Sequence, residues 1–381
     1  MNRIGNWRFI LSLVLVFCLF LMPACKPEEV TPTPEPEPDP EPPRATTVHV
    51  VGWGDAANGA FPCYWKDGQF VDLNVCLYSG PVRAEGYVQA IFISGNDVYA
   101  GGWVSCKYQR VASYWKNGIR TDIRRRNASS YANSLFVSGA DVYLAGWTNY
   151  HGIDIPCYWK NGARVDLNQL GPNVPAEANS IFVSGNDVFV AGTSWAAAGK
   201  NQFPQVPCYW KNGELIELSR FDAEHSGYGN AIVVADGNVY VAGYAGDQTS
   251  LGVPCYWLNG VRTDLSKIAK DVTGWGNSIH VSGSDIYVGG VTQNGSCVLI
   301  PCCWKNGKRT DLSMINPALG GWVSSIFVLG SDVFVAGHNG YDPNLGADSP
   351  VPCYWKNGVR TDLSPGTYPG AYATAISATY K

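Results

Sequence analysis

One repeated segment constrains the fold of this chain more than any other feature. An aromatic residue followed by Trp, with Cys in place of the first aromatic in one copy, recurs at spacings of 44 to 51 residues. Regular self-similarity at such a period is typical of repeat architectures, in which each repeat is one supersecondary unit. The seven tryptophans are Trp65, Trp115, Trp159, Trp210, Trp257, Trp304 and Trp355.

Each repeat is predicted to contain four short strands. In one copy they cover residues 180–183, 187–191, 207–210 and 214–218, with tight turns after the first and third strands. Asn-Gly between two β-rich runs is a strong hairpin signal, because both turn residues need a positive φ. It recurs at Asn117, Asn161, Asn212, Asn259, Asn306 and Asn357. Four strands in about 48 residues is the period of a propeller blade.

The two ends of the repeat region predict a closed ring. Residues 47–53 match the second strand of a repeat, and residues 375–380 match the first strand. The C-terminal segment would therefore complete the blade begun at residue 47 and remove an exposed edge. Six full repeats and this composite give an all-β, seven-bladed β-propeller over residues 47–381. A β-solenoid and separate sandwiches are the alternatives, but neither requires the ends to be complementary halves of one repeat.

The first 24 residues are predicted to be a signal peptide. Residues 9–22 form an apolar run behind a basic start, too short to span about 30 Å of hydrocarbon comfortably. The run ends in Leu-Met-Pro-Ala-Cys, which resembles a bacterial lipobox, although Met22 and Pro23 depart from its commonest form. We therefore expect cleavage and lipidation at Cys25. The alternative is ordinary secretion without a lipid.

Residues 25–46 are predicted to be a stalk on the lipidated Cys25. Alternating Pro and acidic residues over 30–43 favour extended polyproline II and cannot form a core. Lys26 and the acidic residues after it resemble the export signal of Bacteroidota surface lipoproteins, which implies an outer-membrane location facing the exterior. The net charge of −4 provides no basic surface for nucleic acid.

The repeat also resembles a known group of sequences. The elements YWKNG and TDL, followed by a loop and an alternating strand, are similar to the extracellular HAF-type repeats of bacterial surface proteins. The resemblance covers residues 47–381. It implies a repetitive β architecture outside the cell, and it implies no activity and no catalytic residue.

The cysteines divide into repeated and unrepeated positions. Equivalent positions in adjacent blades should lie about 10 Å apart, too far for a disulfide or a shared metal. We therefore expect buried thiols at Cys63, Cys157, Cys208, Cys255, Cys302 and Cys353. Cys76 and Cys106 lie outside that position, on loops expected on one face. They are predicted to form a disulfide in an oxidising compartment.

Candidate ligand-binding residues lie at the end of the blades that carries the variable loops. One aromatic set precedes the first strand, interrupted by Glu177: Tyr87, Tyr131, Tyr228, Trp275, Trp322 and Tyr372. Two residues later comes a polar set: Gln89, Asn133, Asn179, Asn230, Asn277, Ser324 and Thr374. A second aromatic set follows the second strand: Trp53, Trp103, Trp147 and Tyr244. Rings beside amides suit sugars; alternatively, these rings cap the core between blades.

The sequence leaves three functions open. The favoured one is a non-catalytic surface lipoprotein that binds glycan through this face. The second is a protein-interaction scaffold within an outer-membrane complex, and the third is a carbohydrate-active hydrolase or lyase. The chain has no GxSxG, HExxH or P-loop motif, and its histidines show no metal-ligand spacing. We therefore expect no enzyme activity, no cofactor and no metal, and a membrane contact through the lipid alone.

Overall fold

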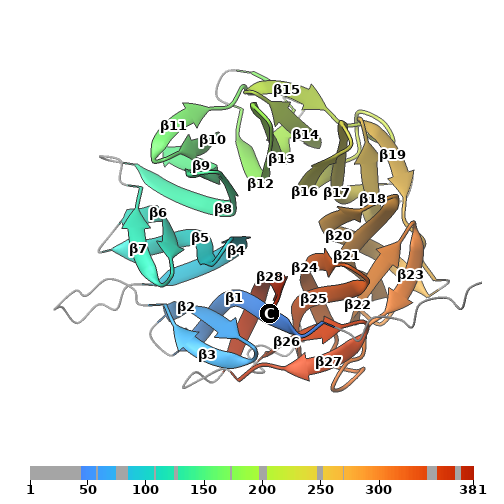
Figure 1. Ribbon diagram of the computed structural model, residues 1–381. Helices are drawn as coiled ribbons and strands as arrows, with labels where there is room; N and C mark the ends of the chain where they lie inside the picture. Colours follow the sequence, from blue (N-terminus) through green and yellow to red (C-terminus); the bar gives the residue numbers. More distant parts are fainter. Residues whose placement is uncertain are drawn as a thin grey trace, which may run out of the picture. The chain divides into compact units, whose positions relative to one another are not determined.

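The computed structural model describes residues 44–56, 59–73, 85–106, 109–123, 128–171, 174–196, 204–246, 252–268, 270–340, 350–364 and 370–381. These residues, all within the compact unit Arg44–Lys381, form 28 strands in seven four-stranded antiparallel sheets. Figure 1 shows the sheets as blades around one axis. The predicted seven-bladed β-propeller is therefore confirmed. Within the described residues, no helix is long and apolar enough to cross a membrane.

Blade 1 consists of β28 and β1–β3, and blades 2 to 7 take four strands each in chain order from β4 to β27. The innermost strands are β28 (Gly370–Tyr380), β4 (Gly86–Ser94), β8 (Ser129–Ser138), β12 (Ala176–Ser184), β16 (Gly227–Ala235), β20 (Asp271–Ser282) and β24 (Gly321–Leu329). The second strands are β1 (Thr46–Ala56), β5 (Asp97–Cys106), β9 (Asp141–Tyr150), β13 (Asp187–Trp195), β17 (Asn238–Gly246), β21 (Asp285–Asn294) and β25 (Asp332–Asn339).

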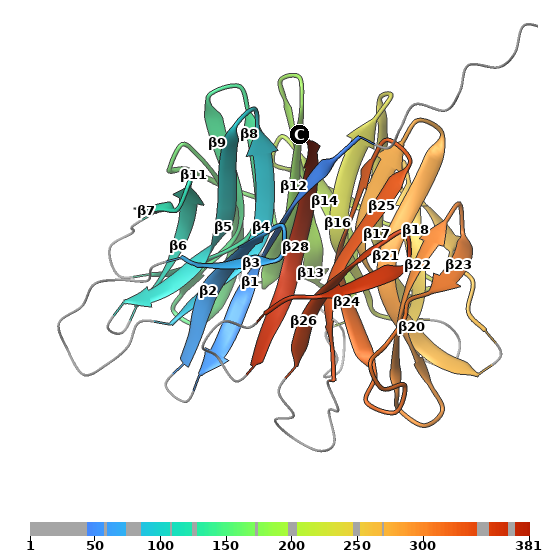
Figure 2. The same ribbon diagram turned by 60° about the horizontal axis from the view of Figure 1, so that its bottom comes forward.

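The outer half of each blade is shorter. The third strands are β2 (Gly59–Lys66), β6 (Gln109–Lys116), β10 (Ile153–Lys160), β14 (Gln205–Lys211), β18 (Gly252–Leu258), β22 (Leu299–Lys305) and β26 (Val351–Lys356). The outermost strands have four residues each: β3 (Gln69–Asp72), β7 (Ile119–Asp122), β11 (Ala163–Asp166), β15 (Glu214–Glu217), β19 (Val261–Asp264), β23 (Lys308–Asp311) and β27 (Val359–Asp362). Seen from the side in Figure 2, the sheets stand next to one another around the axis.

The ring closes in blade 1 as the sequence predicts. Strand β28 pairs antiparallel with β1, and Ile376 lies opposite Val50. The first strand begins at Thr46, one residue before the predicted boundary. Because β28 also packs against β4 and β25 of the two adjacent blades, the C-terminal strand holds both sides of the closure.

The repeated Trp fills the space between adjacent blades. Its side chain is buried in every blade, and its indole N–H commonly donates to a backbone carbonyl of the preceding blade. Trp65 of blade 1 donates to Ser364 O of blade 7 at 2.6 Å, and Trp257 donates to Ser219 O at 2.8 Å. The six repeated cysteines are buried and form no disulfide with one another, as expected of structural thiols.

The tight-turn end of the blades carries a repeated polar cluster. The Asn-Gly turns have the expected positive φ, 51° at Asn117 and 81° at Gly118. Asn117 Nδ2 donates to Asp97, Asn117 Oδ1 accepts the amide of Val98, and Lys116 Nζ lies 2.8 Å from Asp97 Oδ2. Lys116 also lies over the ring of Tyr99. The repeated Lys therefore links the two hairpins of its blade.

Removal of β28 should open the ring. A chain ending at Ser364 lacks the inner strand of blade 1, so β1 and the flanks of blades 2 and 7 lose their packing. We expect the cooperative thermal transition to be lost or its midpoint to fall by tens of degrees, measured by circular dichroism. Deletion of Lys381 alone is the control and should leave the midpoint unchanged. A truncated chain that unfolds like the full one would contradict closure by β28.

The Lys–Asp clusters should make the fold acid-sensitive. Hydrogen bonds from Lys116 and Asn117 hold the pKa of Asp97 below its ordinary value of 3.8, and the pKa values of four equivalent carboxyls are lowered in the same way. A carboxyl whose pKa is lower when folded stabilises the fold above the unfolded pKa.

We therefore expect urea stability to be constant down to about pH 5 and to fall as the pH drops through about 4 and below. Asp97→Asn should make the decline shallower, because one linked proton is removed. Stability that rises on acidification through pH 4 would be inconsistent with this linkage. The other four carboxyls are Asp141, Asp187, Asp285 and Asp332.

Candidate functional site

A β-bulge interrupts the innermost strand of every blade at the same place. In blade 2, Val88 lies opposite Gly102 and Ala90 opposite Gly101, so Gln89 is an extra residue without a partner. A bulge re-aims the side chain of its extra residue and bends the strand. The seven extra residues are the predicted polar set: Gln89, Asn133, Asn179, Asn230, Asn277, Ser324 and Thr374.

A glycine on the second strand makes each bulge possible. A Cβ placed on Gly102 would lie 1.9 Å from the carbonyl oxygen of Tyr87, closer than any real contact. Only a residue without Cβ therefore allows the inner strand to approach so closely. The same clash, at 1.8 to 2.1 Å, would occur at Gly52, Gly146, Gly192, Gly243, Gly290 and Gly337.

The bulge residues form a belt of hydrogen bonds between blades. Asn179 Nδ2 donates to the carbonyl of Gly229 in blade 5 at 3.0 Å, and Asn230 Nδ2 donates to Gly276 O in blade 6 at 3.0 Å. In each case the acceptor directly precedes the next bulge residue. Further links of the belt are Asn133 to Ala178 O, Asn277 to Val323 O and Thr374 to Val88 O.

A second set of contacts lies one residue further along. The Ser180 hydroxyl accepts the amide of Ile232 in the next blade at 3.2 Å, and the Ser278 hydroxyl accepts that of Ile326 at 3.1 Å. Ser134 and Ser325 make the equivalent contact. These serines were not among the residues predicted from the sequence, although Asn-Ser and Ser-Ser at the start of a strand would have been a usable signal.

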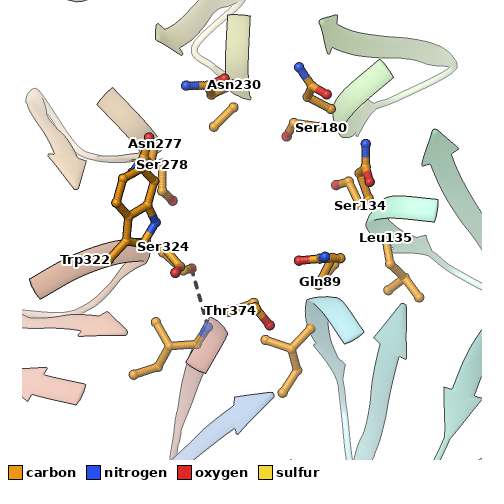
Figure 3. Close-up of a pocket in the computed structure, with 18 residues that line it drawn as sticks. Gln89, Ser134, Leu135, Ser180, Asn230, Asn277, Ser278, Trp322, Ser324 and Thr374 are labelled. Atoms are coloured by element: carbon orange, nitrogen blue, oxygen red, sulfur yellow. Dashed lines mark hydrogen bonds between the residues drawn. The ribbon is translucent and has the colours of Figure 1, made fainter. Parts of the chain in front are cut away.

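The belt surrounds a cavity of about 440 Å³ on the propeller axis. Figure 3 shows Gln89, Thr374, Ser324, Trp322, Asn277 and Asn230 around its wall. The described lining residues are amides, hydroxyls and small or branched apolar side chains with one indole, and none of them is ionisable. All four Asn of the predicted ligand-binding set line this cavity, but Trp322 is the only described residue of the predicted aromatic set that does.

Four of the other predicted aromatics lie at the rim and stack on the second aromatic set. Tyr87 stacks on Trp103 of its own blade with ring centroids 4.4 Å apart, and Trp53 stacks on Tyr372 at 3.9 Å. Tyr131–Trp147 and Tyr228–Tyr244 are further stacked pairs, both at 4.9 Å. All these rings are half-buried. Because each pair covers one face of both rings, little flat surface remains for a ligand.

Contacts between blades join three of these pairs, from Tyr372–Trp53 to Tyr131–Trp147, into one aromatic arc. Trp53 meets Tyr87 at 5.0 Å with a tilt of 58°, and Trp103 meets Tyr131 edge-on at 5.3 Å. Edge-to-face contacts of this kind contribute about 0.5–1.5 kcal/mol each beyond area burial. Arg110, which the sequence did not single out, lies over Trp103 and Tyr131 and donates to the Tyr131 hydroxyl. The arc therefore mainly stabilises the packing of adjacent blades at the mouth of the propeller axis.

Trp275 and Trp322 differ from the arc. Their opposite residues on the second strand are Val291 and His338, so neither has a stacked aromatic partner among the described residues of its blade. The two indoles are tilted by 34° with centroids 6.2 Å apart. In Figure 3, the indole of Trp322 stands along the cavity wall beside Asn277 and Ser278. Its ring is therefore the best-placed flat surface at the cavity.

Glu177 interrupts the aromatic set in blade 4. It lies opposite Thr193, whose hydroxyl is buried without a hydrogen-bond partner among the described residues. Burial raises the pKa of the Glu177 carboxyl, and the nearby Asp154 adds to this. No group of three or more His, Cys, Asp or Glu among the described residues could hold a metal. Cys25, Cys76 and the side chain of Cys106 lie outside the described part, so the lipid and disulfide predictions stay predictions.

Because the Asn residues of the belt donate hydrogen bonds to adjacent blades, we expect them to stabilise the ring. Asn230→Ala removes the donor to Gly276 O and should lower the free energy of unfolding by about 1–2 kcal/mol. Gln89→Ala is the matched control, because Gln89 holds the same bulge position but makes no hydrogen bond within the described residues. It should leave the free energy of unfolding within about 0.5 kcal/mol. Urea titration measures both, and equal losses would be inconsistent with the belt.

No family model matches this sequence, and no curated protein does. Among solved structures it is similar to the β-propeller domain of the Trilobed protease from Pyrococcus furiosus, with 10% identity, a TM-score of 0.45 and coverage of 84% of this chain and 95% of that one. It is also similar to an acylaminoacyl peptidase of Pyrococcus horikoshii, with 10% identity, a TM-score of 0.47 and coverage of 84% of this chain and 51% of that one. A third similar structure is a periplasmic gluconolactonase of Pseudomonas aeruginosa, with 11% identity, a TM-score of 0.43 and coverage of 88% of this chain and 100% of that one. The likeness concerns the fold alone.

Proposed function

We propose that this protein is a non-catalytic, cell-surface lipoprotein that binds glycan at the mouth of the propeller axis. The observation that carries the proposal is the cavity of about 440 Å³, whose described lining combines amides, hydroxyls and one indole without a charged side chain. Its volume is within the range of pockets that bind small molecules.

The chemistry of the lining matches that of a sugar. A pyranose presents hydroxyls that both donate and accept hydrogen bonds, and Asn, Gln, Ser and Thr side chains offer the same two roles. A pyranose also presents a face of C–H groups, which packs on the flat surface of an aromatic ring. Trp322 supplies that surface at the cavity wall.

The alternatives are less well supported. Glycoside hydrolysis requires two positioned carboxyl groups, and the described lining of the cavity contains neither Asp nor Glu. A protein-interaction scaffold would use the variable loops of the same face rather than the cavity. An outer-membrane partner that binds independently of any glycan would favour that second function.

The proposed location rests on the N-terminal sequence. Residues 1–24 would be removed, a lipid on Cys25 would hold the chain to the outer membrane, and the stalk 25–46 would raise the propeller toward the exterior. Two acyl chains anchor a protein stably, whereas one gives only marginal binding.

Loss of Trp322 should weaken glycan binding. Trp322→Ala removes the ring surface at the cavity wall, worth about 1–2 kcal/mol or roughly a tenfold loss of affinity. Trp275→Ala is the control, since Trp275 is the equivalent ring of the adjacent blade and is not among the cavity-lining residues. A glycan array identifies the ligand, and calorimetry then compares both variants at a temperature where each is folded. Equal affinities for wild type and Trp322→Ala would contradict the role of this ring.

Substitution of Cys25 should release the protein from the membrane. In Cys25→Ser the lipid acceptor is absent, so we expect the chain in the soluble fraction without incorporated radiolabelled palmitate. The stalk substitution Thr33→Ala keeps both the acceptor and Lys26, and it serves as the control. Membrane retention and labelling of Cys25→Ser would show that the anchor lies elsewhere.

A further inference from the structure

The belt around the cavity is interrupted at two of its seven positions. The bulge residues of blades 1, 3, 4, 5 and 6 each donate to the next blade. In blades 2 and 7, Gln89 and Ser324 hold the equivalent positions, and neither side chain makes a hydrogen bond within the described residues.

The side chains differ at the two interruptions. The Asn amide reaches the carbonyl of the adjacent blade at 2.7 to 3.1 Å, and the Gln89 amide extends one methylene beyond that reach. The Ser324 hydroxyl, as long as the Thr374 hydroxyl that reaches Val88 O, makes no such contact within the described residues. Both groups remain on the cavity wall, where Figure 3 shows them on either side of Thr374.

The two bulge side chains that make no hydrogen bond within the described residues lie in one sector of the cavity wall. Blades 7, 1 and 2 are consecutive around the ring, and they carry Trp322 and Ser324, Thr374, and Gln89 respectively. The opposite sector consists of the Asn residues of blades 3 to 6, which the belt holds in place. The one ring on the wall and the two free polar side chains therefore belong to the same side of the cavity.

We infer that this sector is the primary sugar-binding subsite. It binds one or two sugar units at the uncharged end of a saccharide. The inference rests on the proposed function and specifies its ligand. The sugar ring packs on Trp322, while its hydroxyls bond to Ser324 and to both ends of the Gln89 amide. These bonds replace water and disturb no existing contact.

Charge and size set the class of ligand. A carboxylate or sulfate in the cavity would lose its hydration without gaining a positively charged partner, because no Lys, Arg or His is among the described lining residues. The volume of about 440 Å³ admits a short terminus rather than the middle of a chain. The aromatic arc at the rim has its faces covered by ring–ring stacking, so it adds few further subsites.

The test compares the two sectors with matched substitutions. Calorimetry on the full folded domain uses neutral mono- and disaccharides, together with the uronic-acid form of each. We expect Gln89→Ala and Ser324→Ala to lower the affinity for the best neutral saccharide about three- to tenfold each without a change in the urea midpoint. Asn230→Ala, in the opposite sector, should lower the urea midpoint and lower the affinity less than either of these substitutions.

Each outcome separates this inference from the proposed function. Binding of neutral saccharides that weakens more in Gln89→Ala and Ser324→Ala than in Asn230→Ala supports both. If Asn230→Ala loses affinity and the other two do not, the sector is wrong while glycan binding stands. Preference for the uronic-acid forms overturns the uncharged ligand and again leaves glycan binding in place. No binding of any saccharide by the wild-type protein overturns both.

Discussion

The close approach of the two inner strands at one glycine per blade is the constraint on which the rest of this structure depends. At Gly102 and its equivalents there is no room for a Cβ, so the inner strand can bulge toward the axis. The bulge turns one polar residue per blade onto the axis, and those residues join the blades and line the cavity. Packing of the blades and the candidate ligand site therefore have the same origin.

Repetition and its exceptions serve different purposes in this ring. Where the repeat is kept, as at Asn179 and Asn230, the side chain is used to hold the adjacent blade. Where it is broken, as at Gln89, Ser324 and Glu177, polar groups remain at the axis or the rim that the scaffold does not need. In a ring of near-identical blades, most residues at one repeat position can thus stabilise the fold, while the residues that differ remain available for contact with other molecules.

Several features of the fold could be predicted because they depend on neighbours in the chain. The Asn-Gly turns follow from the positive φ that both residues must adopt, and closure by residues near Ile376 follows from the two half-repeats. The candidate site was predictable only in part. The polar set was located near the channel mouth, but the commitment of Asn133, Asn179, Asn230 and Asn277 to inter-blade bonds depends on contacts between residues about 45 to 50 positions apart.

The amino-acid sequence by itself determined the number of blades, their strands and the way the ring closes, because periodicity and turn chemistry are local properties. Only the tertiary structure decided which aromatic and polar side chains line the axial cavity. Tyr87 and Trp322 hold the same position in the repeat, yet one stacks on Trp103 and the other lines the cavity. The residue opposite on the second strand is the stacking partner Trp103 in blade 2 and His338 in blade 7, and such contacts between strands exist only in the folded chain.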